Sequence, residues 1–73
     1  MLNIACYICD APAIESDHTG DTHAVDCPKC KHYLVTDSAV AVFGRLAEQE
    51  RLAALEAARK RNPEEPRIEA SRL

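Results

Sequence analysis

Four cysteines in two pairs carry the clearest chemical signal in this sequence of 73 residues. Cys6 and Cys9 form the first pair, and Cys27 and Cys30 form the second. A gap of two residues lets both sulfurs of one loop face a single ion, and two such loops supply four thiolates in a tetrahedron. The spacing therefore predicts a structural site for one Zn²⁺ per chain, with all four cysteines as ligands.

Other uses of four cysteines are less consistent with the sequence. Disulfides need an oxidising compartment, and a redox-active C-x-x-C pair of the thioredoxin type needs a βαβ context that is absent here. An iron site of the rubredoxin type uses the same four thiolates, so the sequence alone does not separate iron from zinc. Imidazole also binds zinc, but with four well-spaced cysteines no ligand is needed from His18, His23 or His32.

The predicted metal site gives no reason to expect catalysis. A catalytic zinc needs an open coordination position, and four cysteine ligands close it. The sequence also shows no Ser-His-Asp set, no phosphate-binding loop and no suitably placed pair of acids. We therefore expect that the protein is not an enzyme.

The second cysteine pair lies in a small basic and aromatic segment. Lys29, Lys31 and His32, with Tyr33, could contact a nucleic acid, because lysines bind phosphates and an aromatic ring stacks on a base. The alternative is that Tyr33 packs in the core while the lysines are solvated. The acidic balance of residues 1–44, which carry two lysines and six acids, favours this alternative.

The elements that position the cysteines are predicted to be short. A chain of this size usually needs a metal, disulfides or a partner to supplement its core. Residues 22–26, THAVD, and 32–36, HYLVT, have the β-branched and aromatic content of two antiparallel strands around the second pair. A β-hairpin of two to three short antiparallel strands is therefore expected to hold the cysteines.

A long helical pattern follows the second strand. Thr36 or Asp37 is suited to the N-cap, and Asn62 and Pro63 end the pattern. Gly44 disfavours a continuous helix and could instead be a hinge between a short first helix and a longer second one. We expect its apolar face to pack on the hairpin and, further along, to meet a protein partner or a second copy. The residues of this face are Val40, Phe43, Leu46, Leu52 and Leu55.

The predicted architecture is a small α+β domain stabilised by metal. A zinc ribbon is expected over residues 1–36, and the C-terminal helix, packed in part on the ribbon, over 37–62. Two prolines and mixed charges predict a disordered tail over 63–73. The start of the chain lacks a basic segment followed by a long apolar run, so a cytoplasmic protein without a membrane span is expected.

The chain resembles a zinc ribbon with rubredoxin-like knuckles over residues 4–36. "CPKC" is the usual second knuckle of that family, and strands flank it in "HAVDCPKCKHYLVT". Ribbons often carry glycine after each second cysteine, whereas this sequence has Asp10 and Lys31 there. Here the first knuckle means residues 6–10 and the second knuckle residues 27–31. Many small bacterial and phage proteins share this arrangement.

A narrower similarity, limited to the ribbon, is to the Com-type zinc-finger translational regulators of Mu-like phages. Those proteins bind messenger RNA, so this similarity implies a small nucleic-acid-binding regulator that uses the second knuckle. The helical pattern after Thr36 is not part of it. The function expected first is therefore a zinc-binding structural and interaction module that contacts a protein through its helix, with nucleic-acid binding as the alternative.

Overall fold

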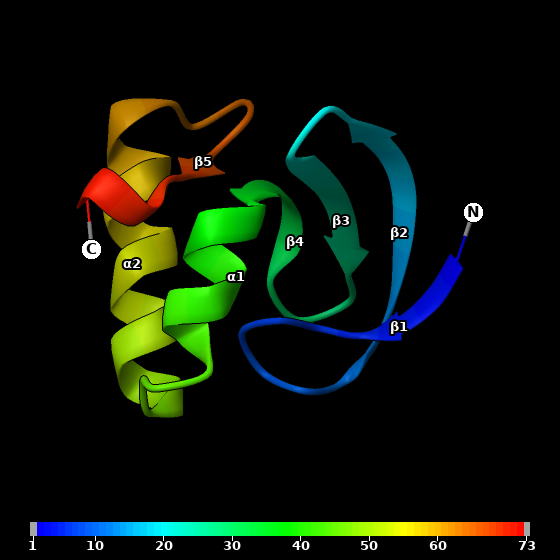
Figure 1. The fold of residues 1–73 in the computed structure, drawn as a ribbon, viewed down its shortest axis with the longest axis horizontal. Coiled ribbons are helices and arrows are strands. Elements are labelled where there is room, and N and C mark those ends of the chain that lie inside the picture. The colour runs from blue at the N-terminus through cyan, green and yellow to red at the C-terminus, as the bar shows by residue number, and fades with distance from the viewer. Residues whose placement is uncertain (1, 73) are drawn as a thin grey trace.

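The computed structural model describes residues 2–72, except for the side chains of residues 17–19 and 72. One sheet of five strands, in the order β1-β2-β3-β4-β5, carries the fold. Two α-helices and the C-terminal segment lie beside β4 and β5, and β1 forms the opposite edge of the sheet (Figure 1). The strands are β1 (Leu2–Ala5), β2 (Pro12–Thr19), β3 (Thr22–Cys27), β4 (Lys31–Thr36) and β5 (Arg67–Ile68). The helices are α1 (Asp37–Phe43), α2 (Glu48–Arg61) and the 3-10 helix η1 (Ala70–Arg72).

The first four strands form an antiparallel meander. The first knuckle connects β1 to β2, and the second connects β3 to β4. Between β2 and β3 the chain turns at Gly20, whose φ of 61° favours glycine. The predicted pairing of the two strands around the second cysteine pair is confirmed, with Val25 opposite Tyr33. The predicted hairpin of two to three strands has too few strands, because β1, β2 and β5 extend the sheet to five strands.

Side chains alternate between the two faces of the sheet, as a strand requires. Val25, Tyr33 and Val35 are fully buried on the face that α1 and α2 cover, whereas Ala24 and Leu34 on the other face are only half-buried. The four cysteines lie at one end of this core: Cys6, Cys27 and Cys30 are buried, and Cys9 is half-buried. The core and the cysteine cluster are therefore continuous.

The prediction of one continuous helix over 37–62 is wrong, and the alternative, a short helix and a longer one separated near Gly44, is what the structure has. Thr36 is the N-cap of α1, as expected, and its Oγ1 accepts a hydrogen bond from the Ala39 N–H at 3.2 Å. The helix ends at Phe43, and the chain turns through residues 44–47 before α2 begins. At Ala47 the backbone is extended, and its N–H donates to the Glu50 carboxylate at 3.2 Å, which starts the second helix. The break lets α2 fold back and bury Leu55 and Ala58.

The predicted disordered tail is also wrong for the residues that the structure describes. Residues 67–68 form β5, which pairs in parallel with β4, and the Leu34 N–H donates to the Pro66 carbonyl at 2.8 Å. Pro66 and Ile68 are buried beside α2 because they fill the space between that helix and β4. Residue 73 lies outside the described residues. Within the described part, no helix is long and apolar enough to cross a membrane.

Candidate metal centre

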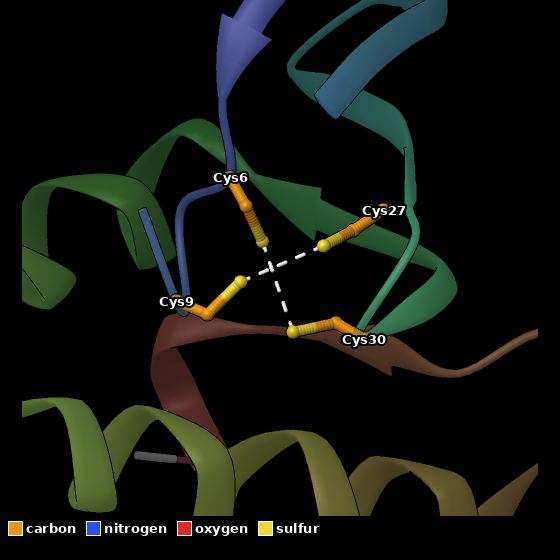
Figure 2. A group of neighbouring side chains, drawn as sticks. All are labelled: Cys6, Cys9, Cys27 and Cys30. Atoms are coloured by element: carbon orange, nitrogen blue, oxygen red, sulfur yellow. Dashed lines mark hydrogen bonds between the residues drawn. The ribbon is translucent and has the colours of Figure 1, made fainter. Parts of the chain in front are cut away.

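The four cysteine side chains converge from the two knuckles (Figure 2). Their sulfur atoms all lie within 4.8 Å of one another. The Cys9 and Cys27 sulfurs are 3.5 Å apart, and those of Cys6 and Cys30 are 3.8 Å apart. Zn–S bonds of about 2.3 Å place the sulfurs of a tetrahedron about 3.8 Å apart. The four thiols therefore fit a tetrahedral metal ion, and all four cysteines are free of disulfides.

Both knuckles end in a residue with a left-handed backbone conformation. Asp10 has a φ of 63° and Lys31 a φ of 67°, so each pair is followed by a residue in the left-handed region. These are the positions at which ribbons often carry glycine. In the first knuckle the Ile8 N–H donates to Cys6 Sγ at 3.4 Å, and the Asp10 N–H donates to the Cys6 carbonyl at 3.0 Å. The turn thereby directs the Ile8 N–H towards sulfur.

The pKa values of the thiols differ with their surroundings. Burial raises the pKa of the Cys27 thiol. This effect is outweighed by hydrogen bonds from the Cys30 and Lys29 N–H groups and by interactions with the neighbouring cysteines, so the pKa of Cys27 falls to about 7. Burial and the neighbouring sulfurs raise the pKa of the Cys30 thiol. Burial likewise raises the pKa of Cys9. A divalent cation among the sulfurs would offset their mutual repulsion and favour the thiolates of all four.

Tyr33 belongs to this centre and not to an exposed surface. Its ring is fully buried, so it is not available to stack on a base, and the favoured alternative, that Tyr33 packs in the core, is confirmed. The Tyr33 hydroxyl accepts a hydrogen bond from the Tyr7 N–H at 3.2 Å and lies 3.3 Å from Cys6 Sγ. Because a thiolate has no proton, the hydroxyl is the donor once Cys6 is deprotonated. Burial and the contact with Cys6 raise the pKa of Tyr33.

The other predicted nucleic-acid contacts remain at the surface. Lys29 and Lys31 are exposed. His32 is partly exposed, and its Nδ1 lies 3.1 Å from Asp26 Oδ1 while its Nε2 lies 3.7 Å from Glu65 Oε2. Acidic side chains are thus interleaved with the basic segment, which weakens its attraction for phosphates.

The predicted helix face divides between core and surface. Phe43 and Leu55 are buried, and Val40 and Leu46 are half-buried against the core. Leu52 keeps 38% of its surface exposed. Only this last residue of the set therefore leaves a substantial apolar surface for a partner.

No histidine joins the cysteine cluster among the described side chains. His23 Nδ1 lies 3.1 Å from the buried Glu15 carboxylate, and its Nε2 contacts Asp37. The Tyr7 hydroxyl also donates to Glu15, at 3.0 Å. The side chain of His18 lies outside the described residues. The four cysteines are the only group of three or more possible metal ligands found within the described part of the chain.

Two arginines of α2 that the sequence analysis did not single out contact the centre. The Arg51 guanidinium donates to the Ile8 carbonyl at 2.9 Å, and the Arg59 guanidinium donates to the Cys30 carbonyl at 2.6 Å. In the sequence, Arg51 stands among glutamates and alanines, and Arg59 stands between alanines and other basic residues, as surface residues of a helix commonly do. No local pattern distinguishes them, because both contacts depend on how α2 packs.

Comparison with known proteins identifies no relative of this chain. No protein-family model, curated protein or solved structure matches this chain. The likeness to zinc ribbons therefore depends on the cysteine spacing and on the geometry of the two knuckles. What the structure establishes is a small α+β fold with four cysteines positioned to hold a metal ion.

Proposed function

We propose that this protein is a zinc-binding structural module in which one Zn²⁺ joins the two knuckles and stabilises the fold. The observation that carries the proposal is the convergence of four sulfurs within 4.8 Å from two loops distant in sequence. Zinc suits four soft thiolates in a closed tetrahedron and has no redox chemistry of its own. A closed site of this kind supports a structural role and not catalysis.

Metal analysis of the purified protein tests this proposal. We expect one zinc per chain, whether the expression medium is supplemented with zinc or with iron. The variant Cys9→Ser should bind zinc more weakly, and Ser38→Ala, at an exposed position of α1, serves as its control. Protein that is folded and contains no metal under all these conditions would contradict the proposal. Iron in place of zinc would keep the site and change the metal.

The proposed interaction role concerns the exposed side of α2. Leu52 is 38% exposed on this helix and offers the apolar contact that a second copy or another protein needs. If a second copy binds there, Leu52→Asp should convert a dimer into a monomer in sedimentation experiments. Ala53→Asp, also at an exposed position of α2, adds the same charge beside it and is the control. A wild-type monomer at all concentrations would exclude self-association.

Nucleic-acid binding is the alternative function and depends on Lys29 and Lys31, the exposed basic residues of the second knuckle. With Tyr33 buried, binding would depend on phosphate contacts and should weaken steeply with salt. Binding of single-stranded RNA at low salt, lost in a variant with both lysines changed to glutamate, would support it. The absence of binding at low salt would exclude it.

A further inference from the structure

Two arginines of α2 contact the backbone of the two knuckles, one arginine to each. Arg51 Nε donates to the Ile8 carbonyl at 2.9 Å, and its Nη1 donates to the Leu46 carbonyl at 2.8 Å. Arg59 Nη2 donates to the Cys30 carbonyl at 2.6 Å. Both arginine side chains are partly buried, so solvent competes less for these bonds than at an open surface.

The two arginines lie on one side of α2, and each contacts a different knuckle. Residues eight apart are separated by about 12 Å along an α-helix. Leu55 and Ala58, the two buried residues of α2, lie between Arg51 and Arg59 in the sequence and hold this side of the helix against the core. The helix therefore places one guanidinium at each knuckle, and its packing determines where both groups lie.

The two carbonyls that accept these bonds belong to the turns that orient the sulfurs. Ile8 precedes Cys9 directly, so its carbonyl fixes the peptide that leads to a ligand. Cys30 is itself a ligand, and its peptide leads into Lys31, which has the left-handed backbone conformation. Hydrogen bonds to these carbonyls restrict the rotation of both peptides and thereby keep the sulfurs in the orientation that a metal requires.

Charge adds to the effect of geometry. Four thiolates around Zn²⁺ leave a net charge of about −2. Two guanidinium groups next to the knuckles offset part of that charge. Asp10 reduces the contribution of Arg51, because its carboxylate lies 3.6 Å from Arg51 Nη2, but this aspartate is largely exposed and screened by solvent.

We propose that Arg51 and Arg59 are positioning residues of the metal site, and that the docking of α2 determines how long the metal is retained. This inference rests on the proposed function, because it concerns the same metal. It assigns α2 a role within the chain: the helix holds both knuckles in the binding conformation through their backbone carbonyls.

The test measures how fast zinc passes from the loaded protein to an excess of a chromogenic chelator. Arg51→Met and Arg59→Met keep much of the apolar stem and remove the donors. Each should release zinc at least about tenfold faster, because removing a group that orients a ligand typically weakens metal binding by about 10- to 100-fold. Arg45→Met, at an exposed position in the loop before α2, should release zinc at the wild-type rate.

Lysine variants separate geometry from charge. Arg51 makes two hydrogen bonds to different carbonyls, and a lysine cannot reproduce that planar fork. Arg51→Lys should therefore still release zinc faster. Arg59 makes one bond to the knuckle, so Arg59→Lys should restore much of the slow release. If a methionine variant fails to fold, Arg51→Lys still decides the result, because release at the wild-type rate in this variant overturns the proposal.

A second control distinguishes positioning from a loss of global stability. Ala39→Gly weakens the buried face of α1 without changing either knuckle. If Ala39→Gly accelerates zinc release as much as the arginine variants do at equal loss of stability, the proposal is overturned. Release at the wild-type rate in folded Arg51→Met and Arg59→Met also overturns it while leaving the metal site intact. A wild-type protein that binds no metal removes the proposed function and this inference together.

Discussion

Asp10 and Lys31 occupy equivalent backbone positions in the two knuckles. Their left-handed conformation costs a residue other than glycine about 1–2 kcal/mol. Aspartate tolerates this conformation better than lysine does, because its short polar side chain bonds locally. The lack of glycine at these positions does not argue against the site, because Asp10 and Lys31 keep the left-handed turn geometry.

We expect Lys31→Gly to stabilise the protein. At a φ of 67° glycine removes the strain, and its larger loss of chain entropy cancels part of the gain, which leaves about 0.5–1 kcal/mol. Denaturant unfolding of the metal-loaded protein measures the difference. Lys29→Gly removes the same charge and should lower the stability, because Lys29 does not have a positive φ. A stabilising effect of equal size in both variants would show that charge, and not backbone strain, is responsible.

Several elements are joined by polar contacts that the sequence does not reveal. His23 of β3 contacts Glu15 of β2 and Asp37 at the start of α1, and the His23 and Tyr7 rings lie 5.8 Å apart. Burial disfavours the charged imidazole, but the hydrogen bond and charge of Asp37 and the charge of Glu15 outweigh it, so the pKa of His23 is raised. This residue joins two strands to a helix.

The stability that these contacts contribute should depend on pH. Because the folded-state pKa of His23 lies above its unfolded value of about 6.5, the contribution is complete below that value. It is lost as the pH rises through the raised folded-state pKa. We expect the difference in unfolding free energy between wild type and His23→Gln to shrink over this range, as measured by denaturant titrations from pH 5 to pH 9. A difference that grows with pH would contradict the assignment.

The C-terminal segment, predicted from the sequence to be disordered, contains strand β5 and contributes to the core. Ile68 is 1% exposed and lies in β5, between β4 and α2. We expect Ile68→Ala to lower the unfolding free energy by about 2–5 kcal/mol, since it opens a cavity in a small core. Ile14→Ala, at a side chain that is 39% exposed, should cost less than about 1 kcal/mol. Equal effects in thermal unfolding would indicate that β5 does not contribute to the core.

At the scale of the whole molecule, the cysteine cluster and the apolar core form one unit. A domain of this length has a small core, and its net stability is expected to be about 5–10 kcal/mol. Binding of a structural zinc contributes on the order of 10 kcal/mol or more. The metal contribution is thus comparable to the whole stability of the fold.

Removal of the metal should therefore unfold much of the protein at moderate temperature. We expect an excess of EDTA to abolish the thermal transition seen by circular dichroism, and added Zn²⁺ to restore it. Mg²⁺ should not restore it, because this ion requires oxygen ligands. An unchanged transition after complete metal removal, verified by metal analysis, would show that the core alone stabilises the fold.

The sequence by itself determined the features that depend on local geometry. A gap of two residues places both sulfurs of a knuckle on one side of a turn, and the composition of 22–26 and 32–36 favours strands. These features, and the N-cap at Thr36, therefore follow from residues close together in the chain. The predicted ligand set, Cys6, Cys9, Cys27 and Cys30, is the group that the structure brings together.

Only the tertiary structure decided where the C-terminal half lies. The break between α1 and α2, the strand at Arg67–Ile68 and the contacts of Arg51 and Arg59 all depend on surfaces formed by residues far away in the sequence. Composition describes arginine as a surface residue and a segment with two prolines as disordered. Packing against β4 and the two knuckles gives these residues their positions, because burial and hydrogen bonding at long range outweigh weak local preferences.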